Sequence, residues 1–314
     1  MTPATQRELR ATLLVNPVAR GVPRDLDTAE LLSYLARRQV RTSVIIPGSA
    51  AEATREAARS AERGEDLLFV LGGDGSVRDA ALGLAGSETA LAAVPAGTVN
   101  VWAKEAGIPS GIRRALHAHI YGQSIHMDLG RAAGQVFLLM AGVGWDARIA
   151  RHVSHRLKRL SGDLAYMAHA ALVAPRLRPS RVRWSTPSGE AEHLLAWMIL
   201  SNSRLYGGKV RLTPDAAVDD GELDVLAFCP ETLPDTLRLA LKVVRGARED
   251  RRMIRMREPA LTIETPGLPV QLDGDYVGDT PMAFSSDHRA LLVSVPAGPL
   301  APIFHAPHDD RRKR

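Results

Sequence analysis

The chain has 314 residues, 45% of them hydrophobic and 24% charged, which is enough for about two globular domains. Its one cysteine, Cys229, excludes an internal disulfide, and no apolar run approaches the roughly 20 residues that cross a bilayer. A net charge of +5 suits an anionic partner such as a nucleotide, a membrane surface or a nucleic acid, and selects none of them. Residues 1–15 lack the apolar core of a signal peptide, so we expect a cytoplasmic protein.

The first third of the sequence alternates between strand and helix patterns. Apolar runs of strand length are separated by segments with helical spacing, and this alternation predicts a mostly parallel sheet. The expected strands are 11–17, 40–46, 67–71 and 90–94, and the expected helices are 26–38, 51–63, 77–84 and 101–106. Ligands bind such sheets at the carboxyl ends of the strands, where NPVARG, GGDGS and PAGTVN occur here.

Short strands replace the helices after about residue 125, so we expect a mainly antiparallel β domain there. Two helices are expected to interrupt it, near 147–176 and 233–249. The expected strands are 126–129, 136–141, 181–185, 194–201, 224–228, 261–264, 270–272 and 291–295. The predicted domains are therefore 1–125 and 126–298, followed by a basic tail, 299–314, that returns to the N-terminal domain and then becomes disordered.

The GGDGS stretch follows the predicted strand 67–71 and precedes a helix. Glycines let backbone N–H groups approach an anion, and a helix N-terminus favours negative charge, so the stretch suits a nucleotide phosphate. Asp74 would then face a hydrated Mg²⁺, and Ser76 would donate to a phosphate or cap the helix. A tight turn capped by Asp74 or Ser76 explains the same residues equally well. The sequence is neither a Walker A loop nor a GxGxxG fingerprint.

Two other strand ends carry polar turn residues. Asn16 ends the first predicted strand, and Gly97, Thr98 and Asn100 follow the strand 90–94. Each is most often part of an ordinary turn. Their occurrence at neighbouring strand ends favours a shared nucleotide site.

These motifs, in this order, resemble the diacylglycerol kinase catalytic-domain family, which includes sphingosine and ceramide kinases and bacterial lipid kinases. NPVARG, GGDGSVRDAALGL and PAGTVNVWAKE resemble its N-terminal motifs. The motifs that resemble its C-terminal half are MDLG, AGVGWDARI, LSGDLAYM, YGGKVRLTPDAAVDDGELDVLAF and QLDGDY. The likeness runs from about residue 12 to residue 298.

The resemblance implies an N-terminal α/β domain with a parallel sheet like that of NAD kinases and 6-phosphofructokinases, followed by a mainly antiparallel β-sandwich. It implies ATP and Mg²⁺ as cofactors and a lipid as substrate. Asp74 and Asp128 would be acids of the nucleotide and magnesium network, and Asp273 would be the general base. The implied nucleotide-binding residues are Asn16, Gly72, Gly73, Asp74, Gly75, Ser76, Asp79, Gly97, Thr98 and Asn100. A structural metal would bind Asp220 and oxygens of Ala217 and Glu222.

Two of these acids have simpler explanations, because Asp-Gly is a strong turn signal. Without the resemblance, Asp273 would be read as a hairpin turn residue, and Asp220 is balanced between a metal ligand and a turn residue. Phosphoryl transfer to an alcohol needs a carboxylate within reach of the hydroxyl, and the resemblance implies that Asp273 is this base.

The sequence departs from the family pattern at several acids. Asp79 and Asp275 stand where the family usually has Glu, and Val101 stands where many diacylglycerol kinases have Asp. The loss of the acid at 101 weakens diacylglycerol as the specific substrate.

Two basic stretches, 148–162 and 245–258, are compatible with helices that carry an Arg/Lys/His face. Such a face is either solvated or in contact with anionic lipid headgroups. Without interleaved aromatic residues, they do not suggest nucleic-acid binding.

We therefore expect an ATP-dependent lipid kinase at the inner face of the membrane. A kinase of a small soluble substrate and a regulatory nucleotide- or lipid-binding module are the rivals. The sequence does not decide which lipid is used, or whether the protein forms a homodimer.

Overall fold

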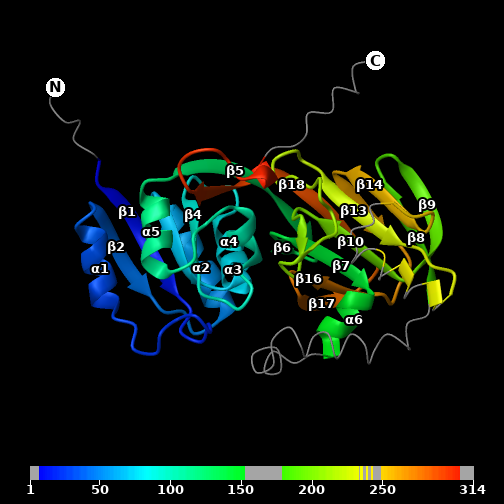
Figure 1. Cartoon of the computed structure of the whole chain (residues 1–314), viewed down its shortest axis with the longest axis horizontal. Helices are drawn as coiled ribbons and strands as arrows, with labels where there is room; N and C mark the ends of the chain where they lie inside the picture. Colours follow the sequence, from blue (N-terminus) through cyan, green and yellow to red (C-terminus); the bar gives the residue numbers. More distant parts are fainter. Residues whose placement is uncertain are drawn as a thin grey trace, which may run out of the picture. The chain divides into compact units, whose positions relative to one another are not determined.

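The computed structural model describes residues 7–152, 179–232, 234–235, 238–239, 242 and 249–304. Chain contacts divide it into two compact units, Met1–Met127 with Arg289–Pro302, and Asp128–His288 with Ile303–Arg314. Among the described helices, none is long and apolar enough to cross a membrane. Figure 1 labels most of the helices and strands of the two units.

Unit 1 contains a parallel sheet in the order β2-β1-β3-β4, as the alternating pattern predicts. Its strands are β1 (Leu9–Val15), β2 (Val40–Ile45), β3 (Leu67–Gly72) and β4 (Ala90–Pro95). Its helices are α1 (Thr28–Ala36), α2 (Ala50–Glu62), α3 (Asp74–Leu84), α4 (Val101–Glu105) and α5 (Ile112–Ile120). Every residue of β3 is buried, which is typical of a parallel strand covered on both faces. Helix α5 was not predicted from the sequence.

The strand order places a topological switch point between β1 and β3. From β1 the chain moves outward to β2, and from β3 it moves in the opposite direction to β4. Right-handed crossovers then put α1 on one face of the sheet and α2 and α3 on the other. Ligands of such sheets bind outside the carboxyl ends of the strands at this point. In this chain those ends are Asn16, after β1, and Gly73, after β3.

A close contact between α2 and α3 explains one glycine of the GGDGS motif's helix. A Cβ at Gly83 would lie 2.2 Å from the carbonyl oxygen of Thr54 and 2.8 Å from Cβ of Ala57. The Thr54 hydroxyl also donates to the carbonyl of Asp79, 2.8 Å away. Only glycine therefore lets the two helices approach this closely, which fixes how α3 leaves the end of β3.

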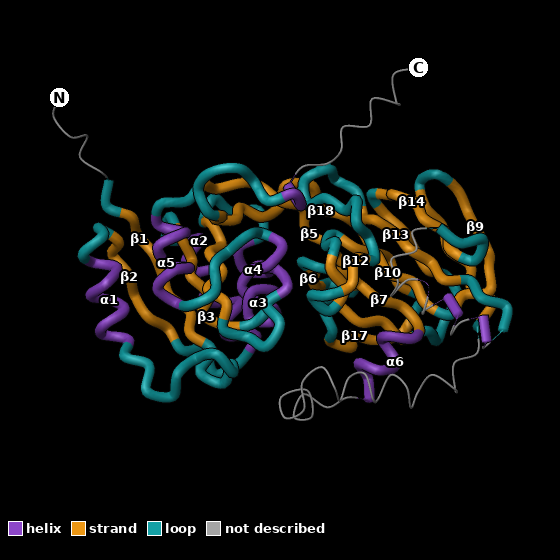
Figure 2. The backbone as a smooth tube through the Cα atoms, viewed as in Figure 1, coloured by secondary structure: helices purple, strands orange, loops and turns teal. Residues whose placement is uncertain are grey.

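Unit 2 is a mainly antiparallel β-sandwich, as predicted. One sheet has the order β14-β13-β10-β7-β16-β17, and the facing layer contains β18, β15, β8 and β9. Figure 2 labels β13, β10 and β7 of the first sheet and β18 and β9 of the second layer. The strands of the first sheet are β7 (Met140–Gly144), β10 (Trp197–Ser201), β13 (Leu223–Phe228), β14 (Met253–Glu258), β16 (Pro269–Leu272) and β17 (Asp275–Asp279). Those of the facing layer are β8 (Ser180–Thr186), β9 (Gly189–Leu195), β15 (Ala260–Ile263) and β18 (Met282–Val295). Inward-facing residues of both layers, including Trp184, Met198, Leu223 and Phe284, form one apolar cluster.

The remaining elements of the described chain are short or connecting. They are β5 (Gln123–Ala132), β6 (Gln135–Phe137), α6 (Trp145–His152), β11 (Leu205–Tyr206), β12 (Val210–Arg211) and the 3-10 helix η2 (Pro302–Phe304). The expected helix near 147–176 is described only up to residue 152, and the LSGDLAYM motif lies outside the described residues. Most of the expected helix near 233–249 also lies outside them.

Strand β18 differs from the expected strand 291–295. It is longer, starts at Met282, and its last residues belong to unit 1, where Val293 pairs in parallel with Leu91 of β4. The apolar alternation of this segment predicts a strand. Its partner depends on long-range pairing, which local pattern does not encode.

The expectation of a helix across 245–258 is wrong for its last six residues, which form strand β14. Met253–Glu258 pairs antiparallel with Leu223–Phe228 of β13. Ile254 and Met256 pack against the apolar cluster, whereas Arg255 and Arg257 lie on the opposite face of the strand. An apolar-charged alternation of period two was thus mistaken for a solvated helix face.

Candidate active site

Three loops meet at the carboxyl ends of the strands of unit 1. The Asn16 Nδ2 group donates to Ser76 Oγ, 2.8 Å away, which joins the end of β1 to the start of α3. The N–H of Gly21 donates to the carbonyl of Ala96 at 2.7 Å, which joins the NPVARG loop to the PAGTVN loop. These contacts bring together the loops after β1, β3 and β4.

The glycines of two of these loops touch. A Cβ on Gly97 would lie 2.6 Å from Cα of Gly73, so the GGDGS and PAGTVN loops pack backbone against backbone. A Cβ on Gly72 would lie 2.7 Å from Ser76 Oγ. Gly75 differs, because a Cβ there would meet nothing within 4 Å and its φ is not positive. Its missing side chain therefore leaves the first turn of α3 open to an approaching ligand.

Asp74 joins the GGDGS loop to the helix after the PAGTVN loop. Its Oδ2 accepts the N–H of Val101 and its Oδ1 accepts that of Trp102, each at 3.0 Å, so it caps α4 from a distant part of the chain. Burial raises the pKa of Asp74, and the two N–H groups partly oppose the shift. Val101, where many diacylglycerol kinases have Asp, is 6% exposed and packs in the core of the unit.

Two other predicted nucleotide-binding residues, Asn100 and Asp79, lie in different elements, the first in the loop after β4 and the second in α3. Asn100 has a left-handed φ of 52°, and its side chain holds the Gly97 backbone through bonds of 2.8 and 2.9 Å, so it shapes the loop that also carries Thr98. For Asp79, a role at the nucleotide stays a prediction. Asp79 lies in α3, rotated by roughly 140° from Asp74, with its carboxylate 3.7 Å from Arg78.

In unit 2, Asp128 organises the Asp220-Gly221 turn. Its side chain is fully buried in β5, where Oδ2 accepts the N–H of Gly221 at 2.6 Å and Oδ1 lies 2.8 Å from Nδ1 of His288. Gly221 has a φ of 77°, and a Cβ there would lie 3.2 Å from His288. His288 was not predicted from the sequence, because its segment matches none of the motifs.

The surroundings of Asp220 fit the predicted structural cation. Asp220 Oδ2 and Asp224 Oδ2 are buried atoms without a hydrogen-bond partner in the part of the chain that the structure describes, while Asp220 Oδ1 accepts the Glu222 N–H at 3.0 Å. Burial raises the pKa of Asp220, and it raises that of Asp224 to about 6. Carboxylate and carbonyl oxygens are the ligands that Mg²⁺ prefers.

The cation would be held by few side chains. The described residues contain no cluster of three or more His, Cys, Asp or Glu side chains placed to hold a metal. The predicted donor set, in which Asp220 is joined by oxygens of Ala217 and Glu222, stays a prediction. Ala217 is fully buried beside the turn.

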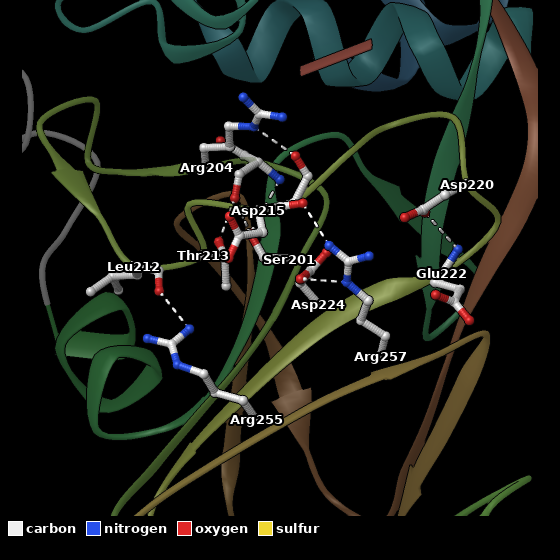
Figure 3. Close-up of polar contacts among 12 residues, drawn as sticks. Ser201, Arg204, Leu212, Thr213, Asp215, Asp220, Glu222, Asp224, Arg255 and Arg257 are labelled. Carbon is white, nitrogen blue, oxygen red and sulfur yellow. Dashed lines mark hydrogen bonds and ion pairs between the residues drawn. The ribbon is translucent and has the colours of Figure 1, made fainter. Parts of the chain in front are cut away.

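Figure 3 shows that arginines of β14 contact the loop that precedes this turn. Arg257 lies 3.3 Å from Asp224 and donates to the carbonyl of Asp215 at 2.7 Å, and Arg255 donates to the carbonyl of Leu212 at 3.0 Å. These two arginines therefore hold their own unit together, although their sequence stretch was a candidate contact for lipid headgroups.

Asp273 lies in a two-residue hairpin turn between β16 and β17. Asp273 and Gly274 have φ angles of 48° and 90°, as a type I′ turn requires, and Leu272 pairs with Asp275 across it. The Asp273 carboxylate accepts three backbone N–H groups, from Leu138, Leu139 and Met140, at 2.9 to 3.0 Å. The simpler reading of Asp273 as a turn residue is confirmed, and its role as base stays a prediction.

Comparison with known proteins agrees with this architecture. Residues 10–132 match the diacylglycerol kinase catalytic domain, and residues 140–295 match the YegS C-terminal NAD kinase beta sandwich-like domain. The chain is 34% identical over 248 residues to a probable lipid kinase YegS-like of Pseudomonas aeruginosa, covering 78% of this chain and 80% of that protein. It is 29% identical over 294 residues to a diacylglycerol kinase of Bacillus subtilis, covering 91% and 96%.

Solved structures share the fold. A crystal structure of a putative diacylglycerol kinase from Bacillus anthracis aligns with a TM-score of 0.78 at 21% identity, covering 95% of this chain and 98% of that one. A second structure under a similar name aligns with a TM-score of 0.74, covering 92% and 98%. At this identity the likeness supports the architecture of both units.

Proposed function

The chain belongs to the family of diacylglycerol kinases and YegS-like lipid kinases, and from this membership we propose that it transfers the γ-phosphoryl group of ATP to a hydroxyl of a membrane lipid. Diacylglycerol, a sphingoid base or another glycerolipid is the substrate. The observation that carries the proposal is the convergence of three strand-end loops in unit 1, held by the Asn16–Ser76 bond and the Gly73–Gly97 contact.

Unit 1 binds the nucleotide in this proposal. The bare backbone at Gly75 and the N-terminus of α3 receive the phosphates, because exposed N–H groups and the helix dipole both favour anions. Ser76, fixed by Asn16, donates its hydroxyl hydrogen to a phosphate oxygen. Mg²⁺, when bound, neutralises the charge that develops on the transferred group. Asp74 fixes the loop after β4 through α4 and supplies negative charge next to the nucleotide.

Unit 2 supplies the base. Asp273 takes the proton of the lipid hydroxyl as the phosphoryl group is transferred. Its carboxylate is held by three N–H groups, and a carboxylate oxygen accepts more than one hydrogen bond. The three contacts fix the direction in which the carboxylate points, so no reorganisation is needed when the hydroxyl arrives.

A lipid panel tests the activity. The protein, labelled ATP and Mg²⁺ are incubated with vesicles that each contain one diacylglycerol, sphingoid base or lysolipid, and the organic phase is counted. We expect label in the lipid fraction. Label confined to water-soluble metabolites would instead support a kinase of a soluble substrate, and ATP binding without any transfer would support a regulatory module.

Asp273→Asn tests the base. We expect turnover to fall by about 10² to 10⁴-fold with unchanged ATP affinity, because general base catalysis contributes that much. Asp279→Asn is the matched control, since Asp279 ends the same hairpin and its side chain contacts Arg151 at 3.5 Å. Activity of Asp273→Asn close to that of the control would exclude Asp273 as base.

Thermal unfolding tests the structural cation separately. At ten times its Kd, bound Mg²⁺ stabilises the folded chain by roughly 1.4 kcal/mol. We expect that increment in the wild type and its loss in Asp220→Asn. Asp287→Asn, which removes an ion pair with Arg131 in the same unit, is the control and keeps the increment. Equal responses of all three proteins would exclude Asp220 as a ligand.

A further inference from the structure

A buried acid that has no assigned role lies behind the Asp273 turn. Asp146, in the first turn of α6, is 2% exposed, and its Oδ2 accepts a hydrogen bond of 3.0 Å from Nε2 of Gln271. Gln271 is itself 4% exposed, and its Oε1 accepts the N–H of Gly274 at 2.5 Å. A chain of two hydrogen bonds thus connects a buried carboxylate to the turn that carries Asp273.

The donor and acceptor groups allow only one orientation of the Gln271 amide between Gly274 and Asp146. The N–H of Gly274 only donates, so the oxygen of the Gln271 amide must face it. The amide NH₂ then faces Asp146, where only an acceptor satisfies it. Burial raises the pKa of Asp146 to about 6, and the Gln271 hydrogen bond partly opposes that shift. Asp146 therefore supplies the acceptor that the Gln271 amide NH₂ needs.

The surrounding backbone makes room for this chain. Gly142 pairs with Gln271 across β7 and β16, and a Cβ on Gly142 would lie 2.0 Å from Asp146 Oδ2. The register of β16 against β17 shifts between Val270 and Gln271. Bulges of this kind re-aim a side chain, and they are common next to active sites. The AGVGWDA and QLDGD motifs are thereby joined by contact.

The turn is held at both of its residues. Leu138, Leu139 and Met140 fix the carboxylate of Asp273, and Gln271 fixes the N–H of Gly274. Asp273 and Gly274 are the two adjacent residues of this turn, so a shift of Gly274 also displaces Asp273. The support at Gly274 therefore acts together with the three N–H groups in placing the Asp273 carboxylate.

We propose that Asp146 and Gln271 are positioning residues that place the Asp273 carboxylate for proton transfer and act on turnover only through it. The proposal rests on the proposed function, because it takes Asp273 as the base. Asp146 and Gln271 touch neither substrate nor nucleotide in this role. Loss of the chain should therefore change kcat and leave KM for ATP and for lipid in place.

Three variants test the two hydrogen bonds that link Asp146 through Gln271 to Gly274. Gln271→Met and Asp146→Leu approximately keep side-chain size; the first removes both hydrogen bonds and the second removes only the one between Asp146 and Gln271. Asp146→Asn retains an acceptor oxygen and is the matched control. We expect kcat to fall by about 10- to 100-fold in the first two, since a displacement near 1 Å costs that much, with KM within twofold. We expect Asp146→Asn to stay within about threefold of wild type.

A double-mutant cycle separates positioning from a general structural effect. Gln271→Met is combined with Asp273→Asn, and kcat is compared with that of Asp273→Asn alone. A residue that acts only through Asp273 causes no further loss once Asp273 is removed. A further loss of the same size as in the single variant would overturn the proposal, as would a change in lipid KM, which would mean that Asp146 contacts substrate.

Amide chemical shifts give a readout that needs no activity. In the full-length protein, the N–H signals of Leu138, Leu139 and Met140 report on the Asp273 carboxylate. We expect them to move in Gln271→Met and Asp146→Leu and to stay in place in Asp146→Asn. Unmoved signals with full kcat in Gln271→Met would overturn the proposal, even if Asp146→Leu fails to fold. If Asp273→Asn is fully active, the proposed base is wrong and the positioning proposal fails in its catalytic part, whatever these signals show.

Discussion

The dipeptide Asp-Gly occurs three times in the chain, and the two units use it differently. In unit 1, Asp74-Gly75 begins helix α3, and Gly75 has an ordinary φ and open space around it. In unit 2, Gly221 and Gly274 have φ angles of 77° and 90°, so their turns require glycine for backbone reasons. A glycine that the backbone does not require is better evidence for a ligand than one that it does.

The aspartates differ in the same way. Asp74 caps α4, a helix that begins 27 positions later, and so joins two loops of one strand-end site. Asp128 and Asp273 each accept N–H groups that shape a turn or a loop of the β-sandwich. In unit 2 the predicted catalytic acids are therefore also structural supports, and variants there must be compared with structural controls.

The largest effect that we predict from this comparison is for Asp74→Ala. Removal of the carboxylate deprives α4 of its cap, which costs about 1 kcal/mol of unfolding free energy, and lowers turnover by about 10³-fold. Asp27→Ala is the matched control, because Asp27 caps α1 by accepting the N–H of Glu30 at 3.0 Å, away from the strand-end loops. Chemical denaturation and turnover are measured for both proteins.

We expect Asp27→Ala to lose similar stability and to keep full turnover. If both variants lose turnover in proportion to stability, Asp74 is a cap and nothing more. If Asp74→Ala keeps turnover, the nucleotide site in unit 1 is wrongly assigned.

The strand-end site of unit 1 was predictable because parallel strands bring their carboxyl ends to one edge. Asn16, Gly73 and Gly97 are far apart in sequence, yet each follows an apolar run, and that alone places them together. What the sequence did not show is that Asp74 caps α4 and that Asn100 folds back onto Gly97. Those contacts depend on loop conformation, which local pattern does not determine.

The site in unit 2 was less predictable for a physical reason. Antiparallel pairing joins residues that are distant in the chain, such as Gln271 with Gly142, and a side-chain contact joins Asp128 to His288. The motifs marked Asp128 and Asp273, but gave no signal for His288 or Gln271. Strand β14 was not predicted because its six residues, in which apolar and charged side chains alternate, also fit a helix face, and only pairing with β13 decides between the two.

The second prediction concerns how the free energy of unfolding depends on pH. A buried titratable group in each unit changes it by about 3 kcal/mol. In unit 1, burial lowers the pKa of His119 to about 4, and its ring contacts the Ala93 carbonyl and the Ser294 hydroxyl. The unfolded chain binds the proton near pH 6.5, so the contribution of neutral His119 is complete above that pH. It is lost as pH falls toward 4, by roughly 3 kcal/mol in total.

Asp146 in unit 2 acts in the opposite direction, because its pKa is raised to about 6 by burial. Its contribution is complete below the unfolded value near 3.8 and is lost as pH rises through 6. Urea unfolding from pH 4 to 7 is compared for wild type, His119→Gln and Asp146→Asn. We expect His119→Gln to lose less unfolding free energy than wild type as pH falls toward 4. We expect Asp146→Asn to lose less than wild type as pH rises toward 7. Identical pH profiles for all three would show that neither group is linked to folding.

The third prediction concerns the glycines that the turns of unit 2 require. Gly274→Ala and Gly221→Ala each force a Cβ onto a left-handed residue, which costs about 1 to 2 kcal/mol of unfolding free energy. Gly221→Ala also brings the new Cβ to 3.2 Å from His288. Thermal and urea unfolding measure the loss, and a stable Gly274→Ala protein would contradict the type I′ turn.

The smallest predicted effect on stability is for Gly75→Ala, and its sign is the opposite. Alanine is the better helix former, and the new Cβ meets nothing within 4 Å, so the folded chain gains up to about 0.5 kcal/mol. The same methyl group lies where the proposal puts the phosphates. We therefore expect ATP affinity, measured by calorimetry, to fall about tenfold, which is roughly 1.4 kcal/mol.

Gly48→Ala is the control, since Gly48 precedes α2 away from the strand-end loops and the new Cβ would face only the flexible end of Glu52. It should leave ATP affinity unchanged. A Gly75→Ala protein that is more stable but binds ATP more weakly would show that the ligand requires glycine at this position. At Gly221 and Gly274, in contrast, the backbone conformation requires it. Unchanged ATP affinity in that variant would mean that the phosphates approach unit 1 elsewhere than at the start of α3.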